Sequence, residues 1–354
     1  MLAAPPRVTG RAWLVENGAT GEVLLVHNAR QRVPIASITK LMTVLLTLEH
    51  ARLNDVVTVT SDAASVGESS ANLRPGERLT VRELLEAALI QSANDAADAL
   101  ADYVGHGSQA RFVAMMNARA RRLGLRNTHY VRPDGLDAAG HYSSARDVTF
   151  LARVLMHYPV VRQIVRRRTA AITGASLHTW NDLLYSYPGI YGVKTGHTSA
   201  AGWSGIAAAR RGGVSIYATL IGSPDRGRRN ADLTRLLDWG FSQYVRARPV
   251  VKGRAYAEAR LAYGRSSLKL VAAGSLAAPF RAGLRVVRRV VFPDVVSLPV
   301  SRGQSLGQVR IYQRGRLVGA VPLLASRSVG RPGVAGRAGW YARRTLHHMA
   351  WWFS

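Results

Sequence analysis

Residues 34–43 read Pro-Ile-Ala-Ser-Ile-Thr-Lys-Leu-Met-Thr, and they open a long apolar helical pattern that runs to about His50. Apolar residues lie on all sides of this predicted helix, which indicates a position at the centre of a domain. Ser37 and Lys40 stand three residues apart, so the hydroxyl and the amine can touch on one helix face. A serine nucleophile needs a nearby base, and a helix N-terminus favours an oxyanion. Ser37 and Lys40 are therefore the candidate nucleophile and base.

The Ser-x-x-Lys spacing is weak evidence by itself, because Ser266 and Lys269 repeat it. That second copy falls in a strand-like alternation, where residues i and i+3 point to opposite faces. We expect no chemistry there, and the copy shows that other motifs must support the first.

A second motif, Ser92-Ala93-Asn94, falls in a predicted break between two helices. The first of these helices opens with a capping box at Thr80 and Glu83. Ser70-Ala71-Asn72 also matches Ser-x-Asn, and polar residues in helix breaks are most often caps. The case for a functional role of Ser92 and Asn94 therefore depends on the residues that flank them in the sequence.

A third motif, Lys194-Thr195-Gly196, follows a short apolar strand at residues 190–193. An edge strand can pair with an extended peptide, and a glycine lets the substrate backbone approach closely. The lysine and threonine offer a cation and a hydroxyl to a substrate carboxylate. Alone, the triplet is equally compatible with a surface turn.

The order of the three motifs is that of penicillin-binding proteins and class A β-lactamases. Only four of the 48 Lys+Arg residues are lysines, and Lys40 and Lys194 are two of them. Arginine cannot act as a base, so lysine at these positions indicates a need for an amine that can lose its proton.

Over nearly all its length the chain resembles the low-molecular-mass D-alanyl-D-alanine carboxypeptidases, the S11 serine peptidase family. The matching stretches are residues 34–43, 91–97, 116–118, 128–131, 135–136, 141–147, 192–198 and 201–202. The family's middle motif is often Ser-Gly-Asn, whereas here it is Ser-Ala-Asn.

The element pattern and the resemblance predict an α/β (α+β) domain of the serine β-lactamase/transpeptidase type at residues 7–247. Its antiparallel sheet is built from both chain ends around a helical middle. A small all-β sandwich stalk follows at 249–329, then a linker at 330–339 and an amphipathic membrane-anchor helix at 340–354. The expected elements are strands at 12–15, 22–26, 190–194 and 215–221 and helices at 37–50, 80–90, 95–104, 112–123, 147–157 and 231–244.

The resemblance also implies roles for individual residues. Ser37 would attack the carbonyl between two D-alanines, Lys40 would accept its proton, and Ser92 would pass a proton to the leaving D-alanine. No metal or cofactor is expected. The substrate-binding set would be Asn94 for the amide, Lys194, Thr195 and Gly196 beside the terminal carboxylate, the N–H groups of Ser37 and His197 as the oxyanion hole, and Arg229, with Arg228 as its alternative.

To act as a base near neutral pH, Lys40 needs a pKa about 2–3 units below the 10.4 of free lysine. Burial and the like charge of Lys194 are both expected to lower the pKa of Lys40.

Composition bears on location and partners. The net charge of +27 favours anionic partners, and there is no cysteine to form a disulfide or a thiol site. The tail places Leu346, Met349 and Phe353 on one helical face beside tryptophans, which is typical of interfacial binding to an anionic membrane. We expect an exported enzyme on the outer face of the cytoplasmic membrane, with peptidoglycan stem peptides as substrates, β-lactams as inhibitors and no nucleic-acid partner. No complete signal peptide is visible, so we expect either that the true start lies upstream of Met1 or that the sequence has been shortened at this end.

Three alternatives remain at this stage. A D,D-endopeptidase would use the same chemistry on cross-linked peptidoglycan. A β-lactamase is disfavoured because no clear Ser-Asp-Asn motif or glutamate-centred deacylation loop is seen. A non-catalytic basic wall- or nucleic-acid-binding protein would explain the charge but not the three motifs.

Overall fold

The computed structural model describes residues 3–264, 267–336, 338–340 and 342. The chain divides into two compact units, with the boundary between Ser242 and Gln243. This boundary lies a little before the end of the first domain predicted from composition, because the strand that begins at Tyr244 already belongs to the second unit.

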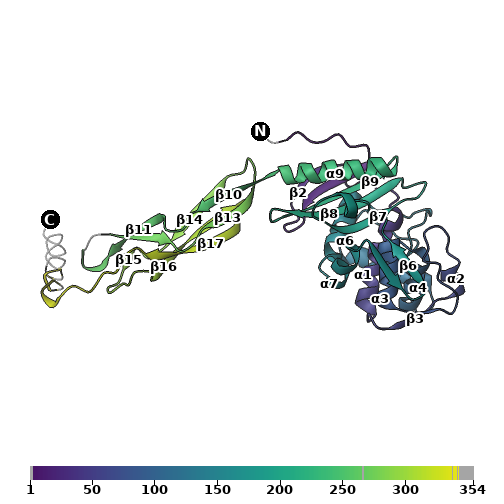
Figure 1. The fold of residues 1–354 in the computed structure, drawn as a ribbon, viewed down its shortest axis with the longest axis horizontal. Coiled ribbons are helices and arrows are strands. Elements are labelled where there is room, and N and C mark those ends of the chain that lie inside the picture. Colours follow the sequence, from purple (N-terminus) through teal and green to yellow (C-terminus); the bar gives the residue numbers. More distant parts are fainter. Residues whose placement is uncertain (1–2, 265–266, 337, 341, 343–354) are drawn as a thin grey trace. The chain divides into compact units, whose positions relative to one another are not determined.

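A five-stranded antiparallel sheet forms the framework of the first unit (Figure 1). Two of its strands come from the start of the chain and three from the end of the unit, which confirms the predicted sheet built from both ends. In spatial order the strands are β2 (Val23–His27), β1 (Ala12–Asn17), β9 (Val214–Ser223), β8 (Trp203–Arg211) and β7 (Ile190–Gly196). Strand β7, which carries the Lys-Thr-Gly motif, is at the edge of the sheet.

Helices cover both faces of this sheet (Figure 1). Gly240 of α9 (Arg226–Ser242) lies against Ile216 of β9. Thr149 of α6 (Ala145–Leu155) makes a 2.6 Å hydrogen bond to Thr219 of the same strand. Side chains alternate between faces along a strand, so Ile216 and Thr219 point to opposite sides. Helix α9 therefore covers one face and α6 the other.

The helical middle of the chain packs behind α6, and α1 (Lys40–His50) is buried from Lys40 to Thr47. The predicted capping box is present at Thr80. The other elements of this part are β3 (Val56–Thr58), α2 (Ser61–Ala64), β4 (Arg78–Thr80), α3 (Val81–Glu86), the π-helical turn η2 (Ala87–Gln91), α4 (Asn94–Val104), α5 (Gln109–Arg122), α7 (Pro159–Val165), β5 (Thr169–Ile172), β6 (Ala175–His178) and α8 (Leu183–Ser186).

Two features differ from the sequence-based expectation. Strand β8 was not predicted, although it lies between β7 and β9 and is buried over most of its length. Pro159 was expected only to end the preceding helix. It instead begins α7, where its missing N–H has no intrahelical partner to lose.

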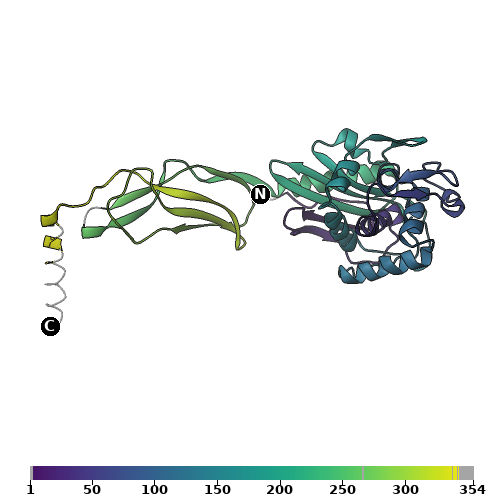
Figure 2. The same cartoon turned by 90° about the horizontal axis from the view of Figure 1, so that it is seen from below.

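The second unit is built from strands (Figure 2). A six-stranded sheet has the order β14 (Val286–Val291), β16 (Ser305–Gln313), β17 (Arg316–Ala325), β12 (Leu268–Ala272), β11 (Ala255–Leu261) and β15 (Val295–Val296). A two-stranded sheet pairs β10 (Tyr244–Val250) with β13 (Leu276–Arg281). Val250 and Phe280 of the small sheet share one apolar core with Leu270 and Ile311 of the large sheet, as expected for a separate β domain.

The C-terminal region is described only in part. The predicted linker contains a helical turn at residues 334–336, and Trp340 packs edge-on against Tyr263 with ring centroids 5.5 Å apart. Tyr341 and residues 343–354, which hold most of the predicted membrane-anchor helix, lie outside the described residues. In the described parts of the chain, every helix is too short or too polar to cross a bilayer.

Candidate active site

Ser37 and Lys40 meet at the start of the buried helix. Ser37 lies in the 3₁₀ turn η1 (Ala36–Thr39), directly before α1. Side chains at i and i+3 eclipse in a 3₁₀ turn, and Lys40 Nζ donates a 2.9 Å hydrogen bond to Ser37 Oγ. The turn is tightly held, because a Cβ at Gly135 would lie 2.2 Å from the Ala36 carbonyl oxygen. This geometry brings a hydroxyl and an amine into contact, as the motif predicts.

Lys40 is fully buried, and its amine makes two more hydrogen bonds, to Asn94 Oδ1 at 2.6 Å and to the Asp134 carbonyl oxygen at 2.8 Å. Burial lowers the pKa of Lys40 to about 8, against the attraction of the nearby carboxylates of Asp134 and Asp98. At neutral pH an appreciable fraction of this amine is therefore unprotonated and able to accept a proton.

The like charge of Lys194 was also expected to lower the pKa of Lys40. The repulsion between the two amines is instead expressed in Lys194, whose pKa falls well below its usual value through burial and then through the charges of Lys40 and Arg229. Lys194 is not among the charged groups that shift the pKa of Lys40.

Ser92 ends the π-helical turn η2 in a left-handed conformation, with φ of 65°. This conformation is costly for serine and persists where the surrounding structure enforces it. It places Ser92 Oγ 2.7 Å from Nζ of Lys194, which donates to it. The break in the helix pattern therefore joins the second motif to the third.

Asn94 begins α4 and connects the first motif to a loop. Its Oδ1 accepts the hydrogen bond from Lys40, and its Nδ2 donates to the Gly67 carbonyl oxygen at 2.8 Å. The competing Ser70-Ala71-Asn72 match lies in the same loop, where Ser70 Oγ donates to Asp95 at 2.6 Å. The second match thus anchors the loop to α4.

Strand β7 runs beside the 3₁₀ turn that carries Ser37. At Gly196 a Cβ atom would lie 3.0 Å from the backbone nitrogen of Ser37, which is tighter than ordinary van der Waals contact. The absence of a side chain at Gly196 therefore keeps the space beside the Ser37 N–H open. The N–H of His197 comes directly after the end of this strand.

One cavity of about 290 Å³ joins these groups. Lys40 and Lys194 lie behind its wall and contact it through Ser37 and Ser92. The lining contains the seven other residues predicted for the site, namely Ser37, Ser92, Asn94, Thr195, Gly196, His197 and Arg229. All nine predicted residues are thus brought together from separate parts of the sequence.

The two arginine candidates differ in position. Arg229 is 2% exposed, lines the cavity and lies over the Trp203 ring, with the guanidinium carbon 5.6 Å from the ring centroid. Arg228 is an exposed residue paired with Asp225 and is absent from the cavity lining. The His197 ring stacks on Trp203 at 4.2 Å. Arg229 is therefore the candidate that can reach a ligand in the cavity.

Sequence reasoning missed several cavity residues. Asp182 holds Arg229 through a 3.2 Å ion pair. Neither Asp182 nor the missed lining residues belong to a short sequence motif. They reach the site only through folding, so the sequence offers no local signal for them. The missed lining residues are Glu68, Ser69, Trp180 and Trp203.

No metal centre accompanies this site in the described part of the chain, where no three His, Asp or Glu side chains gather in a way that would hold an ion. A serine hydroxyl bonded to a buried amine of lowered pKa, beside an edge strand and a cavity, defines an active-site serine acyl-transfer enzyme of the penicillin-binding class.

The chain belongs to the D-alanyl-D-alanine carboxypeptidase family, peptidase S11, whose family model matches residues 1–225. It is 32% identical to D-alanyl-D-alanine carboxypeptidase DacF of Bacillus subtilis over 328 residues, covering 89% of this chain and 84% of that protein. Penicillin binding protein 5 from Haemophilus influenzae superposes with a TM-score of 0.67 at 27% identity, covering 93% of this chain and all of that chain. The Streptomyces K15 DD-transpeptidase superposes with a TM-score of 0.65 at 33% identity, covering 68% of this chain and all of that one.

Proposed function

We propose that this chain removes the terminal D-alanine from peptidoglycan stem peptides through an acyl-enzyme on Ser37. The observation that carries the proposal is the continuous contact between the three motifs. Ser37 touches Lys40, Lys40 touches Asn94, and Lys194 touches Ser92, all at one cavity. Membership of the D-alanyl-D-alanine carboxypeptidase family supports the substrate class.

In the proposed reaction, Ser37 Oγ attacks the carbonyl carbon between the two D-alanines while Lys40 Nζ takes the hydroxyl proton. The oxyanion that forms faces the N–H groups of Ser37 and His197, beside the space that Gly196 leaves open. The C–N bond then breaks, and the leaving amine receives a proton by way of Ser92. Water finally hydrolyses the Ser37 ester and restores the hydroxyl.

Substrate binding is assigned to the remaining groups of the cavity. Thr195 and Arg229 line the cavity and would hold the terminal carboxylate, with the amine of Lys194 bonded to the Thr195 carbonyl oxygen. The substrate backbone would extend along the free edge of β7. Asn94 would orient the substrate amide, which requires its Nδ2 to exchange the Gly67 carbonyl for the substrate.

A first prediction tests the nucleophile. A penicillin opens its strained amide on the same serine, and the acyl group stays attached. We expect the intact protein to gain the mass of one penicillin, and the modified peptide to carry the adduct on Ser37. The matched control is Ser70→Ala, which removes a serine hydroxyl from the neighbouring loop and should leave the adduct in place. An adduct on another residue, or none on the folded protein, would contradict the assignment.

The second unit and the C-terminal residues suggest where the enzyme is located. We propose that the β unit is a stalk and that residues 340–354 bind the surface of the membrane, which places the enzyme at the outer face of the cytoplasmic membrane. Arg343, Arg344 and the tail's apolar residues support this, since basic and apolar residues on one amphipathic helix favour an anionic interface. The net charge of +27 acts in the same direction.

A second prediction tests this anchor. We expect the full chain to sediment with vesicles that contain anionic lipid, and a chain ending at Gly339 to remain mostly in the supernatant. Burial of Leu346, Met349 and Phe353 contributes about 1.5–3 kcal/mol each, so the difference should exceed tenfold in partitioning. A full chain with Met349 and Phe353 changed to serine provides a control of unchanged charge. Equal sedimentation of the truncated and full chains would refute the anchor.

A further inference from the structure

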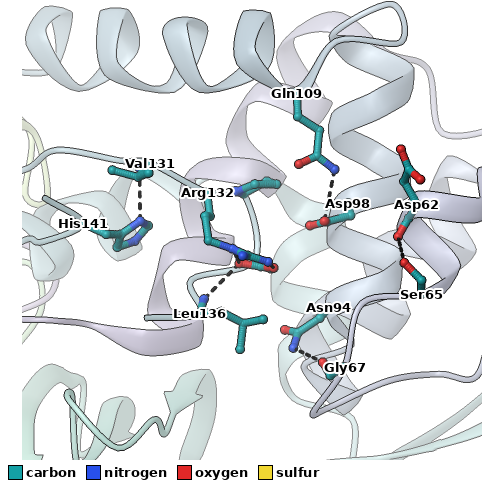
Figure 3. A network of polar contacts seen from close by, with 12 residues as sticks. Asp62, Ser65, Gly67, Asn94, Asp98, Gln109, Val131, Arg132, Leu136 and His141 are labelled. Atoms are coloured by element: carbon teal, nitrogen blue, oxygen red, sulfur yellow. Dashed lines mark hydrogen bonds and ion pairs between the residues drawn. The ribbon is translucent and has the colours of Figure 1, made fainter. Parts of the chain in front are cut away.

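Asp98 is a buried carboxyl group directly behind the active site. It lies four residues after Asn94 on α4, so the two side chains share one face of that helix. Asp98 is 2% exposed, and its Oδ1 has no hydrogen-bond partner within the described residues. Its Oδ2 accepts a 3.1 Å hydrogen bond from Gln109 Nε2 of α5 (Figure 3). An unsatisfied carboxyl oxygen in this position is costly unless the group is protonated or compensated by nearby charge.

The charged groups around Asp98 belong to the catalytic region. Arg132 forms a two-pronged ion pair with Asp134, through Nε at 3.1 Å and Nη2 at 2.7 Å. Figure 3 shows Arg132 in the same polar network as Asp98. The carbonyl of Asp134 in turn accepts from Lys40. Burial, reinforced by the charge of Asp134, raises the pKa of Asp98 to about 7, while Gln109, Arg132 and Lys40 act in the opposite direction.

The coupling between Asp98 and Lys40 acts both ways. The ionised carboxylate of Asp98 raises the pKa of Lys40, after the larger effect of Asp134 and ahead of those of Asp95 and Glu68. Protonated Lys40 correspondingly favours ionised Asp98. Asp62 on the neighbouring helix α2 is exposed and is not among the groups that act on either residue.

We propose that Asp98 is a positioning residue for acylation, whose buried carboxyl group supplies a titratable counter-charge to the ammonium that forms on Lys40. This inference rests on the proposed role of Lys40 as the base. When Lys40 takes the proton of Ser37, an ionised Asp98 stabilises the new positive charge. The same carboxylate keeps Lys40 protonated to a higher pH. Asp98 therefore makes Lys40 a stronger base, but the unprotonated amine forms only at a higher pH.

The pH profile of acylation tests this inference. The rate constant for labelling by a fluorescent penicillin would be measured from pH 6 to pH 10 for the wild type and Asp98→Asn. We expect the half-maximal pH of the variant to fall by about 0.5–1 unit, because a carboxylate no longer supports the protonated amine. Its plateau rate should fall about two- to threefold, because Lys40 becomes a weaker base.

Two further variants separate this role from a structural one. Gln109→Leu removes the donor that favours ionised Asp98, and should move the half-maximal pH in the same direction by less. Asp102→Asn makes the same chemical change one turn further along α4, where the carboxylate accepts from Thr60, and should match the wild type.

An unchanged half-maximal pH in both Asp98→Asn and Gln109→Leu would overturn the inference, whether or not the overall rate falls. If wild-type protein itself were not labelled at Ser37, the proposed function would fail instead, so the two failures are distinguishable.

Discussion

Replacing Lys40 with arginine is expected to abolish acylation by penicillin while preserving the positive charge. The amine of Lys40 has a pKa of about 8 because it is buried, so it can accept the Ser37 proton near neutral pH. A guanidinium stays protonated in proteins and cannot do so. Loss of a general base typically costs 10²–10⁴-fold, and we expect a fall of about 10³-fold in the rate constant for labelling.

The control for this prediction is Lys252→Arg, the same change at an exposed site in the second unit. It should label at the wild-type rate. Both variants would be compared with the wild type by thermal unfolding, so that a loss of fold is recognised. A folded Lys40→Arg protein that labels within tenfold of the wild type would show that Lys40 is not the base.

The sequence predicted the fold where periodicity and polarity agree. Residues 37–50 have an apolar helical pattern on all sides, and α1 is accordingly buried at the centre of its unit. Strand β8 escaped prediction because Trp203–Arg211 contains Gly205 and three consecutive alanines and shows no alternation of apolar and polar residues. A strand buried on both faces has no wet side to mark it, and its identity comes from pairing with β7 and β9.

The candidate site was predictable to the extent that its groups belong to short motifs. Ser37 and Lys40, or Lys194 and Thr195, are close in sequence, and the type of side chain already limits the chemistry. Trp203 reaches the cavity, and Asp182 reaches Arg229, only through the positions of β8 and α8, which no local pattern specifies. The choice between Arg228 and Arg229 likewise depended on which face of α9 turns inward.

Asp98 illustrates a different limit. In the sequence it is one acidic residue on an amphipathic helix, where a solvated side chain is the ordinary expectation. Its burial follows from the packing of α5 and of the loop at Arg132 and Asp134 around α4, and its raised pKa follows from that burial. The raised pKa of Asp98, which the inference about Lys40 uses, therefore arises from tertiary packing.

The same burial predicts a large and pH-dependent gain in stability for Asp98→Asn. An unfolded aspartate titrates near 3.9, whereas folded Asp98 has a pKa of about 7. Between these values the folded state retains a proton that the unfolded state has released, so the free energy of unfolding falls as pH rises. Well above pH 7 the full cost is present, about 4 kcal/mol for a shift of roughly three units.

Asparagine resembles the protonated acid in shape and charge, so the variant escapes this cost. We expect Asp98→Asn and the wild type to unfold at nearly the same urea concentration at pH 4, and the variant to be more stable by about 4 kcal/mol at pH 8. A gain that is equal at both pH values would reflect packing and not titration. A variant that is more stable at pH 8 but reaches a lower plateau rate would show that the charge at Asp98 is kept at the expense of stability, because Lys40 requires it as a counter-charge.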